Sequence, residues 1–266
     1  MDKSPQRWQR GSMAVAVVSV LTACGVVPKP PADIQLDQSV FAWNGRRVRI
    51  ESYSSHDAQP PQSTVFLLHG IGGIPGDGAM LREVAFALAR SGHEAVVVRY
   101  FDATGHWVVS RGLAMRRGPE WRQVLRTIAE AHRAANPDRM IGLLGFSLGG
   151  FLAVALAAED LDVDALAVMS AGVLPEHEER DFSVLPPLLI LNGGRDFLVE
   201  PERSAVLERL AAQAGVDVER QIFENEGHVF GREAKHRVSA DMVRFFNRYL
   251  QTGQSVPENV ISRESD

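Results

Sequence analysis

Short apolar runs alternate with amphipathic stretches along most of this chain. The apolar runs cover residues 64–68, 95–98, 140–144, 165–169 and 188–191, and residues 216–223 are interpreted as a further strand. The amphipathic stretches, which have apolar residues at helical spacing, cover residues 79–89, 120–135, 205–214 and 239–250, and a helix rich in small residues is expected over residues 148–158. Buried strands joined by helices form βαβ units with right-handed crossovers. The alternation therefore predicts an α/β fold with a mainly parallel central sheet and helices on both of its faces.

A hairpin pattern precedes the first buried run. Apolar residues alternate through residues 40–50, on either side of Asn44-Gly45. Asn-Gly suits a type I′ turn, because both residues adopt a positive φ at low cost. We therefore expect an N-terminal antiparallel hairpin. The chain has 266 residues, 45% of them hydrophobic, which is enough for one sizeable core. We expect one domain over residues 39–251, followed by a polar tail over residues 252–266.

The N-terminus has the features of an export signal. Positive charges at Lys3, Arg7 and Arg10 precede an apolar run over residues 13–21, which is too short to span a bilayer permanently. The tetrad Leu-Thr-Ala-Cys at residues 21–24 resembles a bacterial lipobox, whose cysteine is acylated and becomes the new N-terminus. Cys24 is the only cysteine in the chain, so it has no disulfide partner. These features predict a signal peptide over residues 1–23, a lipid anchor at Cys24 and a proline-containing tether over residues 24–38.

The predicted location is therefore outside the cytoplasm, with the membrane as a partner. An ordinary secretory signal with an incidental cysteine is the alternative. Gly25 stands where an aspartate would hold a lipoprotein at the inner membrane, so the resemblance implies the outer membrane in a Gram-negative source. Scattered basic residues and a net charge of −5 argue against a nucleic-acid partner.

Residues 145–149, Gly-Phe-Ser-Leu-Gly, have the form G-x-S-x-G at the junction of a predicted strand and a predicted helix. A serine in a tight turn at this junction has its hydroxyl lifted above the sheet, and small residues on both sides prevent clashes. The following helix N-terminus favours developing negative charge. Ser147 is therefore the candidate nucleophile.

A serine hydroxyl needs a general base, and the base needs an acid to orient it. His228 lies between the last predicted strand and the last helix, and Asp196 follows the strand at residues 188–191. Both should lie at the same sheet edge as Ser147, and the order Ser, Asp, His is the one expected for this arrangement. Glu200 and Glu224 are the alternative acids.

Two backbone amides are candidates for the oxyanion hole. One is the N–H of Leu148, the residue after the nucleophile. The other is the N–H of Ile71, because Gly70 lets the chain turn after the strand at residues 64–68. We expect His69 to support this loop by hydrogen bonding, rather than to act as the base.

Five stretches together resemble the dienelactone hydrolase family of the α/β-hydrolase superfamily. They are Leu68-His69-Gly70, the Val96–Phe101 segment, the Gly145–Gly150 segment, Gly193-Gly194-Arg195-Asp196 and Gly227-His228-Val229-Phe230. Named dienelactone hydrolases use a cysteine nucleophile, whereas this chain has Ser147. The resemblance implies the α/β-hydrolase fold and an acyl transfer that needs no cofactor and no metal, on a more general ester than a dienelactone.

The resulting hypothesis is a serine hydrolase that cleaves small-molecule carboxylic esters through a Ser147–His228–Asp196 triad and an acyl-enzyme. A peptidase or an acyltransferase of the cell envelope would use the same triad. The segment at residues 102–119, interpreted as a lid or pocket wall, would distinguish them. A non-catalytic envelope lipoprotein with a binding role is the remaining alternative.

Overall fold

The computed structural model describes residues 29–56, 61 and 63–251. The predicted signal peptide, Cys24 and the predicted polar tail lie outside these residues. One eight-stranded sheet, in the order β1-β2-β4-β3-β5-β6-β7-β8, forms the centre of the described part. Strands β3 to β8 are parallel to one another, while β1 pairs antiparallel with β2 and β2 antiparallel with β4. The mainly parallel α/β fold is confirmed.

The strands are β1 (Ile34–Trp43), β2 (Arg46–Ser55), β3 (Ser63–Leu68), β4 (Glu94–Val98), β5 (Met140–Phe146), β6 (Ala165–Met169), β7 (Leu188–Gly193) and β8 (Val218–Phe223). The α-helices are α1 (Gly73–Arg90), α2 (Arg111–Ala135), α3 (Leu148–Ala158), α4 (Pro201–Gln213) and α5 (Arg232–Leu250). Short 3-10 helices lie at Tyr100–Thr104 (η1), Pro175–His177 (η2) and Phe182–Val184 (η3).

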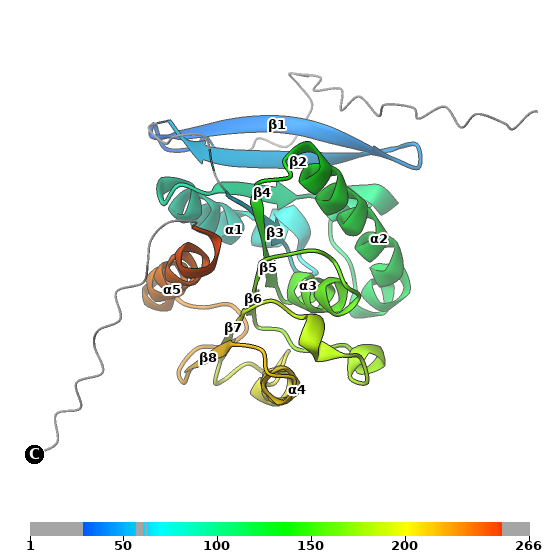
Figure 1. The fold of residues 1–266 in the computed structure, drawn as a ribbon, viewed down its shortest axis with the longest axis vertical. Helices are drawn as coiled ribbons and strands as arrows, with labels where there is room; N and C mark the ends of the chain where they lie inside the picture. The colour runs from blue at the N-terminus through cyan, green and yellow to red at the C-terminus, as the bar shows by residue number, and fades with distance from the viewer. Residues whose placement is uncertain (1–28, 57–60, 62, 252–266) are drawn as a thin grey trace, which may run out of the picture.

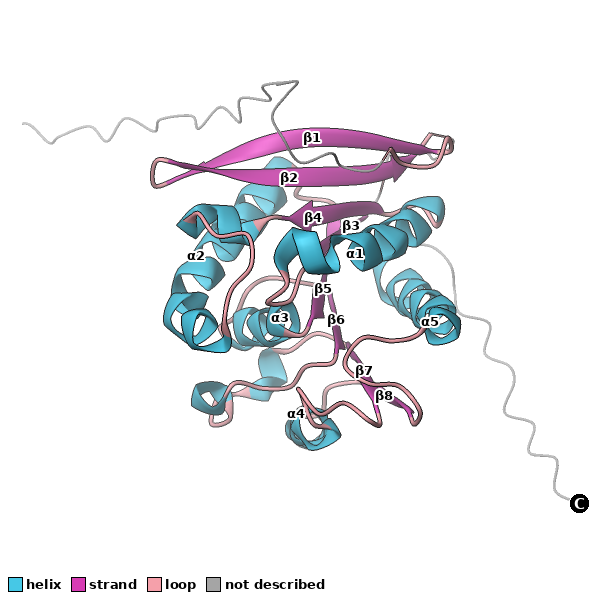
Figure 2. Ribbon diagram, turned by 180° about the vertical axis from the view of Figure 1, so that it is seen from behind, coloured by secondary structure: helices cyan, strands magenta, loops and turns pink. Residues whose placement is uncertain are grey.

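Helices cover both faces of the sheet, as expected from the apolar, buried strands β3 to β7. Figure 1 shows α1 and α5 on one face and α2, α3 and α4 on the other, and Figure 2 shows the same layers from behind. Each face has its own core: Leu81 of α1 and Phe245 of α5 belong to one, and Trp121 of α2 and Leu152 of α3 belong to the other. This two-sided cover leaves the carboxyl edge of the parallel strands for the connecting loops.

The antiparallel hairpin is confirmed, but it is longer than the sequence indicated. Asn44 and Gly45 have φ of 43° and 75°, as a type I′ turn requires. β1 begins at Ile34, so residues 34–38 are strand and the predicted tether over residues 24–38 extends too far. Polar residues alternate with Ile34 and Leu36 here, and every residue from Ile34 pairs with β2. Backbone pairing therefore extends this strand beyond its strongly apolar part.

The segment at residues 102–119 is not one loop. The helix α2 starts at Arg111 rather than after Pro119, and the hydroxyl of Ser110 accepts a hydrogen bond from the N–H of Leu113. A serine side chain that accepts a backbone N–H in the first turn stabilises the start of a helix, so this helix does not need Pro119 to begin. The preceding residues, His106 and Trp107, line a small pocket with Ile74 and Pro75 of α1. The role of this segment as a lid or pocket wall stays a prediction.

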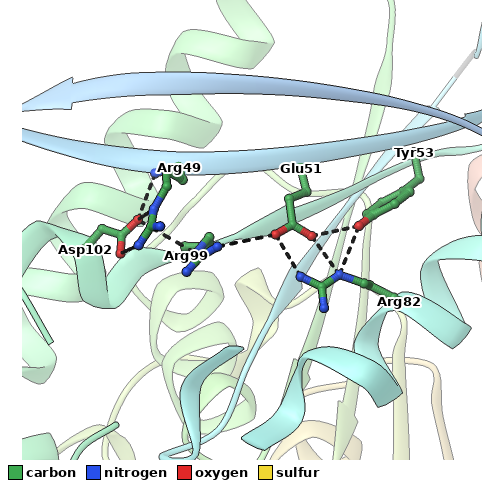
Figure 3. A network of polar contacts seen from close by, with 6 residues as sticks. All are labelled: Arg49, Glu51, Tyr53, Arg82, Arg99 and Asp102. Carbon is green, nitrogen blue, oxygen red and sulfur yellow. Dashed lines mark hydrogen bonds and ion pairs between the residues drawn. The ribbon is translucent and has the colours of Figure 1, made fainter. Parts of the chain in front are cut away.

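A buried network of charges ties the hairpin to the rest of the sheet (Figure 3). Glu51 of β2 accepts hydrogen bonds from Arg82 of α1, both at 2.9 Å, and from the Tyr53 hydroxyl at 2.7 Å. Arg99 lies 3.7 Å from Glu51 and extends the network towards Asp102 of η1. Buried charges are tolerated when they are paired in this way. The network fixes α1, whose N-terminal end follows the loop after β3.

No helix in the described ranges is both long enough and apolar enough to cross a membrane.

Candidate active site

Ser147 occupies a strained turn between a strand and a helix at the centre of the sheet. The strand β5 ends at Phe146, α3 begins at Leu148, and Ser147 between them has φ 52° and ψ −120°. A positive φ is costly for a residue with a side chain, and it persists only where the surrounding structure enforces it. The turn places the Ser147 hydroxyl at the carboxyl edge of β5 and the N-terminus of α3.

Two glycines make this turn possible. A methyl group on Gly145 would lie 2.4 Å from the backbone of Gly149, and one on Gly149 would lie 2.3 Å from the carbonyl oxygen of Leu68. Both distances are far shorter than van der Waals contact, so a side chain at either position would push α3 away from the sheet. The small residues of the G-x-S-x-G pattern are therefore needed by the backbone path.

An unbroken chain of hydrogen bonds joins Ser147, His228 and Asp196. The Nε2 atom of His228 lies 2.9 Å from Ser147 Oγ, and its Nδ1 lies 2.8 Å from Asp196 Oδ2. Asp196 is fully buried, and its Oδ1 accepts from the N–H groups of Leu198 and Val199. When Nδ1–H donates to the carboxylate, Nε2 can accept the hydroxyl proton. The three residues selected from the sequence thus come together from the loops after β5, β7 and β8.

Three further histidines and the two alternative acids form no hydrogen bonds with this group within the described residues. Hydrogen bonds tie three further histidines to side chains other than Ser147 and Asp196: His93, His132 and His177. His228 forms no hydrogen bond with Glu200 or Glu224 in the described part of the chain. Asp196 is therefore the acid best placed to orient the imidazole.

The loop after β3 turns beside Ser147. The Gly73 N–H donates to the Gly70 carbonyl oxygen at 3.1 Å and closes a turn through Ile71. A methyl group on Gly70 would lie 3.1 Å from Ser147 Cβ, so the loop passes close to the serine. Across the described residues, neither the Ile71 nor the Leu148 amide donates to a backbone carbonyl. Leu148 is thus adjacent to Ser147 in the chain, and Ile71 lies in the turn that passes beside it. Neither amide is used by a backbone carbonyl of the described residues, so both can donate to a substrate oxygen.

His69 packs beneath this loop. Its ring is buried, stacks on Tyr100 with the ring centroids 4.0 Å apart, and donates from Nδ1 to the Gly70 carbonyl oxygen at 2.9 Å. Burial lowers the pKa of His69 to about 4, so the ring is neutral near pH 7. This position suits the supporting role expected for His69 and does not suit a base for Ser147.

Ser170 is a positioning residue that the sequence did not reveal. It follows β6, is fully buried, and has φ 51°. Its hydroxyl donates to the backbone carbonyl oxygen of His228 at 3.0 Å, which helps to hold the His228 loop. The only signal in the sequence is a serine after a buried strand, which is too common a pattern to select one residue.

Exposed apolar side chains flank the group. Phe197 directly follows Asp196 and is 88% exposed, and Val229 directly follows His228 and is 58% exposed. On the other side of β5, Trp107 is 67% exposed. No group of three or more potential metal-ligating side chains occurs within the described residues.

Comparison with known proteins identifies the family. The model of the dienelactone hydrolase family matches residues 50–251. The chain belongs to the dienelactone hydrolase family. Membership makes it a hydrolase that acts on ester bonds. A carboxymethylenebutenolidase from Rhodococcus opacus is 29% identical over 217 residues, which cover 72% of this chain and 83% of that protein.

Solved structures of low sequence identity share the fold. A dienelactone hydrolase-like promiscuous phosphotriesterase from metagenomic libraries has a TM-score of 0.69 at 18% identity, covering 82% of this chain and 100% of its own. An α/β serine hydrolase without a lid from Xanthomonas campestris has a TM-score of 0.64 at 20% identity, covering 85% of this chain and 100% of its own. These similarities confirm the α/β-hydrolase fold.

Proposed function

We propose that this chain cleaves carboxylic esters through an acyl-enzyme on Ser147, with His228 as general base and acid. The observation that carries the proposal is the chain of hydrogen bonds from Ser147 Oγ through His228 to Asp196, with distances of 2.9 and 2.8 Å. A serine hydroxyl becomes an effective nucleophile near neutral pH when such a base takes its proton. The strained turn at Ser147 supports the same role, because it presents the hydroxyl at the sheet edge.

In the first half of the reaction, Ser147 Oγ attacks the ester carbonyl carbon while His228 Nε2 takes the hydroxyl proton. The negative charge forms on the former carbonyl oxygen, where the N–H groups of Ile71 and Leu148 stabilise it. His228 then gives the proton to the leaving alcohol. In the second half, a water molecule loses a proton to His228 and attacks the acyl carbonyl. His228 then gives this proton to Ser147 Oγ as the acyl–oxygen bond breaks, which releases the acid and restores Ser147.

A series of p-nitrophenyl esters, from acetate to palmitate, tests this function beside peptide p-nitroanilides. We expect the esters to be hydrolysed and the anilides not to be, because an amine is a much poorer leaving group than a phenol. The apolar side chains of Trp107, Phe197 and Val229 lead us to expect a lower KM for longer, uncharged acyl chains. Preferred cleavage of the anilides would point to a peptidase, and acyl transfer to an added alcohol in preference to water would point to an acyltransferase.

We further propose that the protein is exported and anchored to the cell envelope by lipid on Cys24. The support is the order of positive charge, apolar run and Leu-Thr-Ala-Cys tetrad, and the lack of any other cysteine in the chain. Several acyl chains on one cysteine would make the attachment stable.

Replacing Cys24 with serine should release the protein from the membrane fraction, because the thiol that accepts the lipid is lost. The measurement is incorporation of labelled palmitate, together with fractionation of a Gram-negative host that expresses the full chain. The Ser147→Ala protein is the matched control and should stay labelled and membrane-bound. Membrane attachment of the Cys24→Ser protein equal to that of the wild type would contradict the anchor.

A further inference from the structure

A carboxylate lies directly against the loop after β3. Asp77 belongs to the start of α1, and its side chain reaches back to Gly70 and Gly72, on either side of Ile71. A methyl group on Gly70 would lie 3.0 Å from Asp77 Oδ2 and 3.1 Å from Ser147 Cβ, and one on Gly72 would lie 2.9 Å from Asp77 Oδ1. The carboxylate is therefore a neighbour of both the candidate oxyanion loop and Ser147.

This carboxylate has an unsatisfied oxygen. Asp77 Oδ2 is buried and accepts no hydrogen bond of acceptable geometry from the described residues. Burial raises the pKa of Asp77, while the Gly70 amide and the His228 ring lie near enough to oppose that rise. At this position the carboxylate acts on any charged group that is brought close to Ser147.

The position of Asp77 has a consequence for the charge of the substrate. A carboxylate repels any negative charge brought close to it and attracts a positive one, more strongly where water is excluded. Any ester whose carbonyl oxygen approaches the Ile71 amide also brings its neighbouring groups towards Asp77. The imidazolium that forms on His228 during the reaction is attracted by the same charge.

We propose that Asp77 sets the charge selectivity of this site, so that it accepts uncharged and positively charged esters and rejects negatively charged ones. This rests on the proposed ester hydrolysis at Ser147 and adds the class of substrate. Asp77 acts as a specificity-determining residue, through its charge and not through a covalent or proton-transfer step.

Three p-nitrophenyl esters of matched acyl length test the proposal: one ends in a methyl group, one in a carboxylate and one in a trimethylammonium group. For the wild type we expect kcat/KM to be about tenfold or more higher for the cationic than for the anionic ester. The isosteric Asp77→Asn change should reduce that ratio to within about threefold, because it removes the charge and keeps the shape.

Glu83→Gln is the matched control, because Glu83 lies on the exposed side of the same helix and the change removes the same charge. It should leave the ratio as in the wild type. Equal kcat/KM values or a preference for the anionic ester in the wild type would overturn the proposal, whether or not Asp77→Asn folds. An unchanged ratio in folded Asp77→Asn would overturn it as well.

Failure of the underlying function gives a different result. If the wild type hydrolyses none of the three esters, the proposed ester hydrolysis fails. The rates at which neutral and cationic phosphonates label Ser147 then measure the charge preference directly. If the cationic reagent labels Ser147 faster and the Asp77→Asn change removes this difference, the proposal is supported. Equal labelling rates in the wild type overturn it.

Discussion

Replacing Ser147 with alanine is expected to lower kcat for ester hydrolysis by about 10³-fold or more. The change removes the oxygen that forms the acyl-enzyme and leaves His228 without the hydroxyl that lies 2.9 Å from its Nε2. The protein should stay folded, because alanine adds no atoms to the strained turn. Steady-state hydrolysis of a p-nitrophenyl ester, measured with circular dichroism to monitor the fold, gives the result.

The matched control is Ser183→Ala, at an exposed position in η3. It should keep the activity of the wild type. If folded Ser147→Ala retains more than about a tenth of the wild-type kcat, Ser147 is not the nucleophile.

Replacing Asp196 with asparagine is expected to lower kcat by about 10³- to 10⁴-fold with little loss of stability. Asp196 Oδ1 accepts from the N–H groups of Leu198 and Val199, each at 2.9 Å. The amide oxygen of an asparagine would take that position, and its NH₂ group would face Nδ1 of His228. Nδ1 would then accept, Nε2 would carry the ring proton, and the proton of Ser147 could no longer be transferred to Nε2.

Measurement of kcat beside thermal unfolding separates this tautomer effect from unfolding. The control is Asp181→Asn, because Asp181 also accepts a backbone N–H, from Ser183, at an exposed site. It should leave kcat unchanged. A folded Asp196→Asn protein with kcat within about tenfold of the wild type would remove Asp196 from the mechanism.

Most of the site could be predicted from the sequence because its residues follow buried strands. In a parallel sheet, the loops after the strands lie at the carboxyl edge, so topology places Ser147, Asp196 and His228 at the same edge. Apolar continuity identifies β5 and β7 without knowledge of the side-chain contacts, whereas β8 has the mixed sequence Val-Glu-Arg-Gln-Ile-Phe. The same reasoning placed the loop at Gly70 beside the serine.

Features that depend on contacts between distant residues could not be predicted in this way. Asp77 is an unremarkable acidic residue in a glycine-rich stretch, and only the folded chain brings it against Gly70. The early start of α2 depends on one cap at Ser110, and the early start of β1 depends on pairing with β2. Local apolar patterns contain none of this information.

The most direct test of the central claim is to trap the acyl-enzyme. The wild-type protein is mixed with excess p-nitrophenyl acetate and quenched in acid during turnover, and the mass of the intact chain and of its tryptic peptides is then measured. We predict one added acetyl group per chain, carried by the peptide that contains Ser147. Ester hydrolysis without any acylated Ser147, or with the acyl group on another residue, would contradict the account.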